Sequence, residues 1–286
     1  MKFGLVFANS GPWADAERAV ALATAAEELG YESLWTVEHV VVPSGYESSY
    51  PYSKSGKMPG GEDVPVPDPL IWLAYVAAAT RAITLATGIL ILPQRNPVIL
   101  AKEAATLDVL SGGRFVLGVG VGWLEEEFDV LGVPFERRGA RADEYVAAMR
   151  SLWSASEEGA TFQGEFASFE RAKLYPKPTR ETGVPIVIGG HSEASARRAG
   201  RIGDGFFPAK GDLAHLFEVA RQAAKEAGRD PDKLELTAGG RPSLEEAERL
   251  RDLGVHRITL PPFGSDGESV RGYLEQYREQ VIDKLA

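Results

Sequence analysis

The chain has 286 residues, of which 44% are hydrophobic and 25% charged, and its formal net charge is −10 at pH 7. This acidic balance disfavours a general binder of nucleic acids or anionic membranes, because such proteins need an excess of Lys and Arg. The absence of cysteine excludes disulfides, thiolate catalysis, thiolate zinc sites and iron–sulfur clusters. No run approaches the roughly 20 apolar residues that span a bilayer, and residues 1–8 do not resemble a signal peptide, so we expect a cytoplasmic protein.

Strand and helix patterns alternate along the whole chain, with Gly or Pro at most junctions. Apolar runs predict strands at residues 2–8, 33–37, 83–90, 115–119, 185–189, 205–208, 234–238 and 257–260. Segments of helical period follow at residues 14–29, 69–79, 97–110, 141–153, 192–202, 213–227, 243–253 and 269–284. Alternating strands and helices imply a parallel sheet, and eight such units in a chain of this length favour a closed barrel. We therefore predict an α/β protein with a single (β/α)8 TIM-barrel domain over residues 1–286.

Two connections are longer than the barrel pattern requires. The first, residues 40–68 after the second strand, contains Tyr46 and Tyr50 among several prolines and glycines, a composition typical of a lid or pocket wall. The second, residues 154–183 before the fifth strand, predicts a small hairpin around residues 161–169. We expect the first insertion to shape a substrate pocket and the second to be structural.

Glu38 and His39 follow the second predicted strand, in the region where barrels place their ligand sites. A histidine there can donate a hydrogen bond or transfer a proton near neutral pH. His39 is the strongest catalytic candidate among the four histidines, because His215 falls on a predicted surface helix and His256 precedes a strand at the opposite, stabilising face. The alternative for His39 is a purely structural role.

Glycines mark the ends of the third and fourth predicted strands. In Thr87-Gly88-Ile89, a glycine within an apolar run indicates a bulge or a close backbone approach. Residues 118–122 lack the full Gly-x-Gly-x-x-Gly spacing of a dinucleotide fingerprint, so we interpret them as the place where a flat ring approaches the backbone beside Trp123. The alternative is a Gly-rich turn with Trp123 packed in the core. Residues 125–127 are three glutamates, which we expect to face solvent in an early helical turn.

The fifth predicted strand ends in Gly189 and Gly190, followed by His191 and by Ser192 at the start of a helix. Glycines let a backbone approach a ligand closely, and the N–H groups and dipole at a helix start favour a phosphate. These four residues therefore predict a phosphate site. The alternative is a tight turn with Ser192 as an ordinary N-cap. We expect no metal site, because no His, Asp and Glu cluster has metal-ligand spacing.

Four segments in chain order resemble the luciferase-like monooxygenase superfamily. They are Ser33-Leu34-Trp35-Thr36-Val37-Glu38-His39, residues 85–93 with Arg95-Asn96-Pro97, Ser111-Gly112-Gly113-Arg114-Phe115-Val116-Leu117-Gly118-Val119-Gly120, and Gly203-Asp204-Gly205-Phe206. The resemblance covers nearly the whole chain, and the order of the segments makes it specific. Within the superfamily the chain is most similar to the coenzyme F420-dependent oxidoreductase branch.

This resemblance implies a deazaflavin or flavin whose ring lies at the mouth of the barrel. Taken together with the local patterns, it predicts that the cofactor is bound by Glu38, Thr87, Gly88, Ile89, Gly120, Val121, Gly189, Gly190, His191 and Ser192. Among them, Thr87, Gly88 and Ile89 match a bulge with a non-prolyl cis peptide that supports the ring. Glu38 stands where several relatives carry Asp.

The resemblance also bears on the substrate. Trp123 stands where sugar-phosphate dehydrogenases of this branch carry a catalytic glutamate, so a hydrophobic or aromatic small molecule is expected instead, lined by Trp123, Tyr46 and Tyr50. We predict hydride transfer between coenzyme F420 and this substrate, with His39 as proton donor or acceptor. The alternatives are an FMN-dependent monooxygenase that uses reduced flavin and oxygen, and a non-catalytic flavin-binding protein. Family barrels usually pair, so we expect a homodimer.

Overall fold

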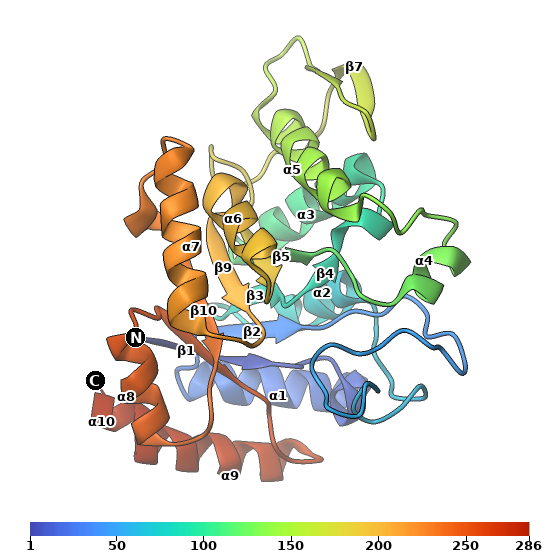
Figure 1. Ribbon diagram of the computed structural model, residues 1–286. Helices are drawn as coiled ribbons and strands as arrows, with labels where there is room; N and C mark the ends of the chain where they lie inside the picture. Colours follow the sequence, from blue (N-terminus) through green and yellow to red (C-terminus); the bar gives the residue numbers. More distant parts are fainter. Residues whose placement is uncertain (286) are drawn as a thin grey trace.

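Parallel strands close into a barrel at the centre of the computed structural model, which describes residues 1–285 (Figure 1). The strands of this barrel are Lys2–Val6 (β1), Ser33–Thr36 (β2), Thr84–Thr87 (β3), Leu90–Ile91 (β4), Phe115–Gly120 (β5), Ile186–Gly190 (β8), Gly205–Pro208 (β9), Glu235–Gly239 (β10) and Arg257–Leu260 (β11). Their order is β3-β2-β1-β11-β10-β9-β8-β5, and pairing of β3 with β5 closes the ring. Because β4 continues β3 alongside β5, the described residues form a ring of eight parallel positions, and the predicted (β/α)8 barrel is confirmed.

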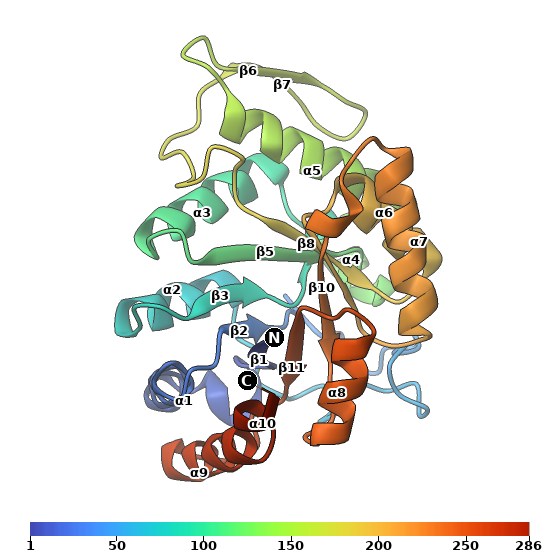
Figure 2. The same ribbon diagram turned by 90° about the vertical axis from the view of Figure 1, so that its left-hand side faces the viewer.

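Helices surround the barrel on its outside, as Figure 2 shows. They are Ala16–Glu28 (α1), Pro69–Ala79 (α2), Pro97–Leu110 (α3), Arg138–Ser154 (α5), Glu193–Ile202 (α6), Leu213–Glu226 (α7), Leu244–Asp252 (α8) and Gly267–Tyr277 (α9). Capping side chains explain several starts: Asp68 and Asn96 each accept two backbone N–H groups, and a proline follows each of them at the first helical position. The predicted last helix is shorter than expected, because a π-helical turn at Arg278–Ile282 follows α9 before the short α10 (Asp283–Leu285).

Alternate strand residues separate two apolar layers. Leu34, Leu85, Ile186 and Phe206 belong to the large cluster that the helices share with the outside of the barrel. The next residue along each of these strands belongs to a smaller cluster made by Trp35, Ala86, Val187 and Phe207. Because successive residues of a strand point to opposite faces, this second cluster fills the inside of the barrel. The barrel is therefore a packed core and not a channel.

The third predicted strand, residues 83–90, is broken in the structure. β3 ends at Thr87, β4 begins at Leu90, and the peptide bond between Gly88 and Ile89 is cis, as the family resemblance led us to expect. Thr87 is fully buried, and its hydroxyl donates to the carbonyl oxygen of Gly118 at 2.6 Å. A Cβ at Gly118 would lie 1.9 Å from the carbonyl oxygen of Thr87, so only glycine lets the two strands approach here.

Both insertions lie where the sequence predicted them. An antiparallel hairpin of Ala160–Gln163 (β6) and Ser168–Ala172 (β7) projects beyond α5, at the top of Figure 2, and confirms the predicted hairpin. The loop 40–68 extends from β2 and lies beside the short helix α4 (Glu125–Val130), which the sequence pattern did not resolve (Figure 1). None of the helices within residues 1–285 is long and apolar enough to cross a lipid bilayer.

Candidate active site

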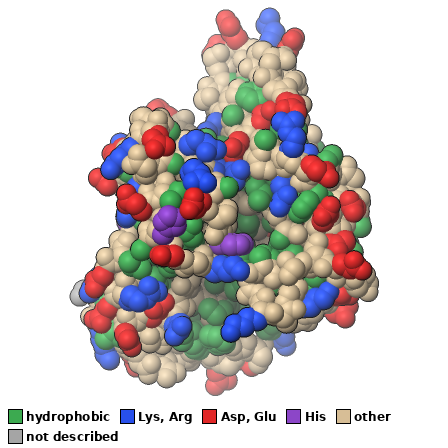
Figure 3. All heavy atoms as spheres, in the orientation of Figure 1, with side chains coloured by type: hydrophobic (Ala, Val, Ile, Leu, Met, Phe, Trp, Pro, Cys, Tyr) green, Lys and Arg blue, Asp and Glu red, His purple; other side chains and the backbone are tan. Residues whose placement is uncertain are grey.

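The carboxyl ends of the barrel strands open onto one mouth, where the loops after β2, β4, β5, β8 and β9 meet. Figure 3 shows that this side of the molecule is hollowed near its centre, with a histidine side chain directly beside a basic one at the rim. Within residues 1–285, no three His, Asp or Glu side chains gather closely enough to hold a metal ion.

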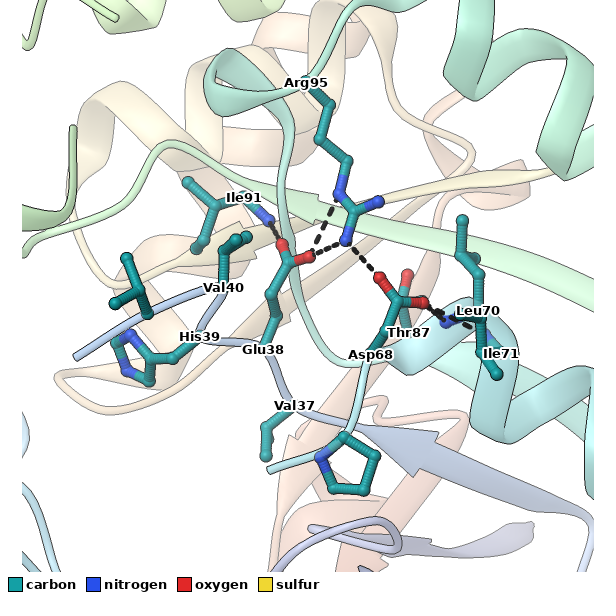
Figure 4. Close-up of polar contacts among 12 residues, drawn as sticks. Val37, Glu38, His39, Val40, Asp68, Leu70, Ile71, Thr87, Ile91 and Arg95 are labelled. Carbon is teal, nitrogen blue, oxygen red and sulfur yellow. Dashed lines mark hydrogen bonds and ion pairs between the residues drawn. The ribbon is translucent and has the colours of Figure 1, made fainter. Parts of the chain in front are cut away.

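Glu38 leaves the end of β2 and enters a buried ionic network (Figure 4). Its carboxylate accepts a hydrogen bond from the backbone N–H of Ile91 at 2.5 Å and from Nε of Arg95 at 3.0 Å, with a second Arg95 contact through Nη2. Arg95 also donates to Asp68 at 2.8 Å, and Asp68 caps α2 through the N–H groups of Leu70 and Ile71. One guanidinium thus ties together the end of β2, the end of loop 40–68 and the start of α2.

The charges of this network follow from its burial. Burial raises the pKa of Glu38, and the positive charge of Arg95 opposes that rise. Burial would lower the pKa of Arg95, but the two carboxylates outweigh it and raise that pKa. Burial would likewise raise the pKa of Asp68, and the hydrogen bonds from Arg95 and the helix start lower it instead. Glu38 is therefore held inside the protein by Arg95 and Ile91, at the edge of the cavity beside His39.

His39 turns the other way from Glu38, as the side chains in Figure 4 show. Its Nδ1 lies 3.1 Å from Oε2 of Glu127 in α4, and its ring meets the ring of Trp123 edge to face at 5.7 Å. The expectation that residues 125–127 face solvent is wrong for Glu127, whose side chain is 1% exposed. The reason is that loop 40–68 folds over α4 and offers it backbone N–H groups, as at Val40, which donates to Glu127 at 2.6 Å.

Glu126 holds a second part of the same loop. Its Oε1 accepts the backbone N–H groups of Glu47 at 2.6 Å and Ser48 at 2.9 Å. Hydrogen bonds from Ser48 and from the backbone lower the pKa of Glu126. Two adjacent carboxylates of α4 therefore fix the first part of loop 40–68, at residues 40–41 and again at residues 47–48.

Aromatic rings form a continuous row across the mouth. The ring of Trp123 contacts those of Tyr46 at 5.5 Å and Tyr50 at 5.1 Å, so the structure brings together the residues predicted to line the substrate pocket. The row continues from Tyr50 to Tyr52 at 5.2 Å and from Tyr52 to His191, also at 5.2 Å. Edge-to-face contacts of this kind give the wall a defined shape.

Ile89 fills the space that two glycines leave open. A Cβ at Gly120 would lie 1.8 Å from Cδ1 of Ile89, and a Cβ at Gly189 would lie 2.5 Å from its Cγ2. These two glycines, with Val121, also border a cavity of only about 10 Å³ between the barrel and α5. Packing against Ile89 therefore accounts for both glycines without a ligand, and the half-buried side chain of Ile89 forms part of the mouth.

The segment after β8 has features of both sequence interpretations, the tight turn capped by Ser192 and the anion site. Ser192 is an N-cap, because its hydroxyl accepts the N–H of Ser195 at 3.2 Å, and a Cβ at Gly190 would lie 2.7 Å from Cβ of Ser195. However, Nδ1 of His191 is buried and has no hydrogen-bond partner among residues 1–285. Burial and then the charge of Lys210 lower the pKa of His191. An orphaned donor or acceptor, a nearby ammonium and a helix start together fit an anionic group.

A cavity of about 320 Å³ adjoins His39 on the side of the ionic network. Its lining residues are Glu38, His39, Val40, Val66, Asp68, Pro69, Gln94, Arg95 and Leu131. Both polar atoms of the Gln94 side chain are buried without a hydrogen-bond partner among residues 1–285. This volume lies at the lower end of the range for small-molecule sites.

Comparisons with known proteins agree with this architecture. A family model described as luciferase-like monooxygenase matches residues 1–283. An uncharacterized protein of Mycobacterium tuberculosis is 32% identical over 278 residues, covering 93% of this chain and 95% of that protein. The F420-dependent glucose-6-phosphate dehydrogenase of Amycolatopsis mediterranei is 32% identical over 219 residues, covering 75% of this chain and 60% of the relative. The crystal structure of a monooxygenase from Streptomyces bottropensis has a TM-score of 0.77 and 25% identity, covering 100% of both chains.

Proposed function

The chain belongs to the luciferase-like monooxygenase family of enzymes, and we propose that it is a coenzyme F420-dependent oxidoreductase acting on an organic, hydrophobic substrate. The observation that carries this proposal is the arrangement at the mouth, where His39 lies at one end of the aromatic row and His191, with Lys210, at the other. The similarity to an F420-dependent dehydrogenase supports the choice of cofactor. Membership of an enzyme family argues against a non-catalytic flavin-binding protein.

The residues of the mouth divide into two roles. His191, Lys210 and the start of α6 at Ser192 would hold the anionic part of the cofactor, since an unpartnered ring nitrogen and an ammonium lie there. Ile89 would contact the ring from the barrel side. When bound, the reduced deazaflavin supplies a hydride to the substrate. His39 would donate or accept the accompanying proton through Nε2, which has no hydrogen-bond partner within residues 1–285.

The substrate proposal rests on the surroundings of His39. Trp123, Tyr46 and Tyr50 present an aromatic wall on one side, and the cavity of about 320 Å³ adjoins the histidine on the other. The aromatic wall favours a hydrophobic part of the substrate, and the mixed lining of the cavity, with Gln94 and Arg95 beside apolar side chains, favours a polar group on the same molecule. The sugar phosphate named for the Amycolatopsis mediterranei relative would meet aromatic rings here and is a poorer match.

The second candidate function is an FMN-dependent monooxygenase. It is favoured by the similarity over the whole chain to the Streptomyces bottropensis monooxygenase. Both candidates would use the same anion site and the same aromatic wall, so the identity of the cofactor decides between them.

We also propose that the protein is a homodimer. α2 and α3 pack side by side, and they expose large apolar side chains, with Ile71 on α2 at 73% and Ile99 on α3 at 59% exposure. Apolar side chains gathered on neighbouring helices are typical of a surface that another protein covers. A second copy of this chain would bury both helices at once.

The test of the hydride-transfer proposal is anaerobic oxidation of reduced F420 by a panel of hydrophobic ketones, enones and quinones, followed by the absorbance of the oxidised deazaflavin. We expect turnover with at least one acceptor. His39→Gln should lose turnover by about 100-fold or more while still binding the cofactor. Equal turnover of His39→Gln and the wild type would remove His39 from the reaction, and product formed only with FMN and oxygen would favour the monooxygenase.

A further inference from the structure

Glu127 contacts both the ring of His39 and the backbone that follows it. Its Oε2 lies 3.1 Å from Nδ1 of His39. Its Oε1 accepts the backbone N–H of Val40 at 2.6 Å and that of Val41 at 3.2 Å. The carboxylate is 1% exposed and comes from α4, a helix that is distant in sequence from His39. A single buried group therefore fixes the ring and the chain on which the ring is carried.

The chemistry of this contact determines which nitrogen of His39 carries hydrogen. An ionised carboxylate only accepts hydrogen bonds, so Nδ1 of His39 must be the N–H donor to Glu127. In the neutral ring the other nitrogen, Nε2, is then an acceptor; among residues 1–285 it has no hydrogen-bond partner, and the side chain of His39 borders the cavity of about 320 Å³. The ring of Trp123 packs edge to face against His39 and limits its rotation.

We propose that Glu127 is a positioning residue that holds His39 in the Nδ1–H tautomer, so that Nε2 is the atom that exchanges a proton with the substrate. The participation of His39 in the reaction rests on the proposed function, whereas the tautomer is a property of the protein alone. Carboxylate–histidine pairs of this geometry set the tautomer of the imidazole in unrelated sites, which supports the chemical reasoning.

The variant Glu127→Gln tests whether Glu127 sets the tautomer of His39 or only supports the loop. In Glu127→Gln, the side-chain oxygen can still accept from Val40 and Val41, so the loop keeps its anchor. The amide nitrogen, however, donates to Nδ1 of His39 and requires that nitrogen to be an acceptor. The variant should therefore hold the opposite tautomer, with hydrogen on Nε2. Glu126→Gln is the matched control, because Glu126 anchors Glu47 and Ser48 from the same helix.

The experiment measures the ring nitrogen shifts of His39 by NMR with 15N-labelled histidine, at a pH where the ring is neutral and without cofactor. We expect hydrogen on Nδ1 in the wild type and in Glu126→Gln, and on Nε2 in Glu127→Gln. Hydrogen on Nε2 in the wild type would overturn the inference by itself, so the result does not depend on the folding of a variant. An unchanged tautomer in Glu127→Gln would overturn it as well.

Kinetics then distinguish this inference from the proposed function. With an acceptor found in the substrate panel, Glu127→Gln should lower kcat by about 100-fold or more, with KM changed little, as expected for a wrong tautomer. Glu125→Gln, an exposed change on the same helix, should leave kcat near the wild-type value. A changed tautomer with an unchanged kcat would contradict the role of His39 in the reaction while leaving Glu127 as the residue that sets its tautomer.

Discussion

Replacing Arg95 with Met should destabilise the protein by leaving a buried carboxylate without its cation. Arg95 contacts Glu38, whose side chain is 1% exposed, and Asp68. Removing one partner of a buried ion pair costs about 3–5 kcal/mol. An unfolding entropy of about 2.1 cal/mol/K per residue, for 286 residues, converts this loss into a fall in Tm of about 5–8 °C. Because the Met side chain fills most of the volume of Arg95, the fall in Tm measures mainly the loss of the positive charge.

The pH dependence of this loss gives the sharper test. Without Arg95, the backbone N–H of Ile91 still opposes part of the rise that burial causes in the pKa of Glu38. An acid whose folded pKa is raised destabilises the fold only where the unfolded chain ionises it, so the deficit should be larger at neutral pH than in acid. It should shrink as the pH falls toward the ordinary value of 4.5.

Thermal unfolding followed by circular dichroism over a pH series measures both effects. The control is Arg197→Met, which removes an exposed ion pair with Glu193 and should cost less than about 1 kcal/mol. A fall in Tm no larger than that of the control, or a deficit that is the same at every pH, would refute the reasoning.

Gly118→Ala should destabilise by about 1–3 kcal/mol in urea unfolding, because the new Cβ would lie 1.9 Å from the carbonyl oxygen of Thr87. Gly272→Ala on α9 has open space and should be neutral or stabilising by up to about 1 kcal/mol; equal effects of the two would contradict the close approach of β3 and β5. Lys210→Met should raise the pKa of His191, measured by NMR titration, because the charge of Lys210 is one cause of its lowered value. An unchanged pKa would show that Lys210 does not act on His191. Ile99→Glu should convert the proposed homodimer to a monomer in analytical ultracentrifugation, and a wild-type monomer would exclude the dimer.

The barrel could be predicted from sequence because its signals are local. Apolar strands alternate with segments of helical period along the chain, and the predicted helices and strands match the observed ones apart from their ends and the break in the third strand. For α4, the sequence pattern placed residues 125–127 in a helical turn but did not give the helix its bounds, because its six residues begin with three glutamates and show no apolar stripe. The break in the third strand lies within an apolar run, and the contact of Thr87 with Gly118 beside it joins positions 31 residues apart, so no local pattern marks it.

The candidate site could be predicted only in part, because local patterns place its strand-end residues but not the contacts between residues distant in sequence. His39, Trp123, Tyr46 and Tyr50 come together because each follows a strand end or lies in the loop that covers it. The pairings that organise the site join distant positions: Glu38 and Arg95 are 57 residues apart, and His39 and Glu127 are 88 apart. A run of glutamates is usually solvated, and nothing local marks the one that becomes buried.

The role of the glycines also needed the structure. Gly120 and Gly189 were interpreted as places where a ligand ring or phosphate approaches the backbone, and both turn out to pack against Ile89. Evidence for an anionic ligand comes instead from His191 and Lys210, of which the sequence pattern identified only the first.

The central claim is the identity of the cofactor, and equilibrium binding tests it most directly. Purified protein is titrated with F420 and with FMN, each in oxidised and reduced form, and binding is followed by absorbance, with Lys210→Met as the variant that weakens the anion site. We predict tight binding of F420, markedly weaker binding of FMN, and loss of F420 affinity in the variant. Preference for FMN would contradict the hydride-transfer account, and binding of neither would contradict the assignment of this mouth as a cofactor site.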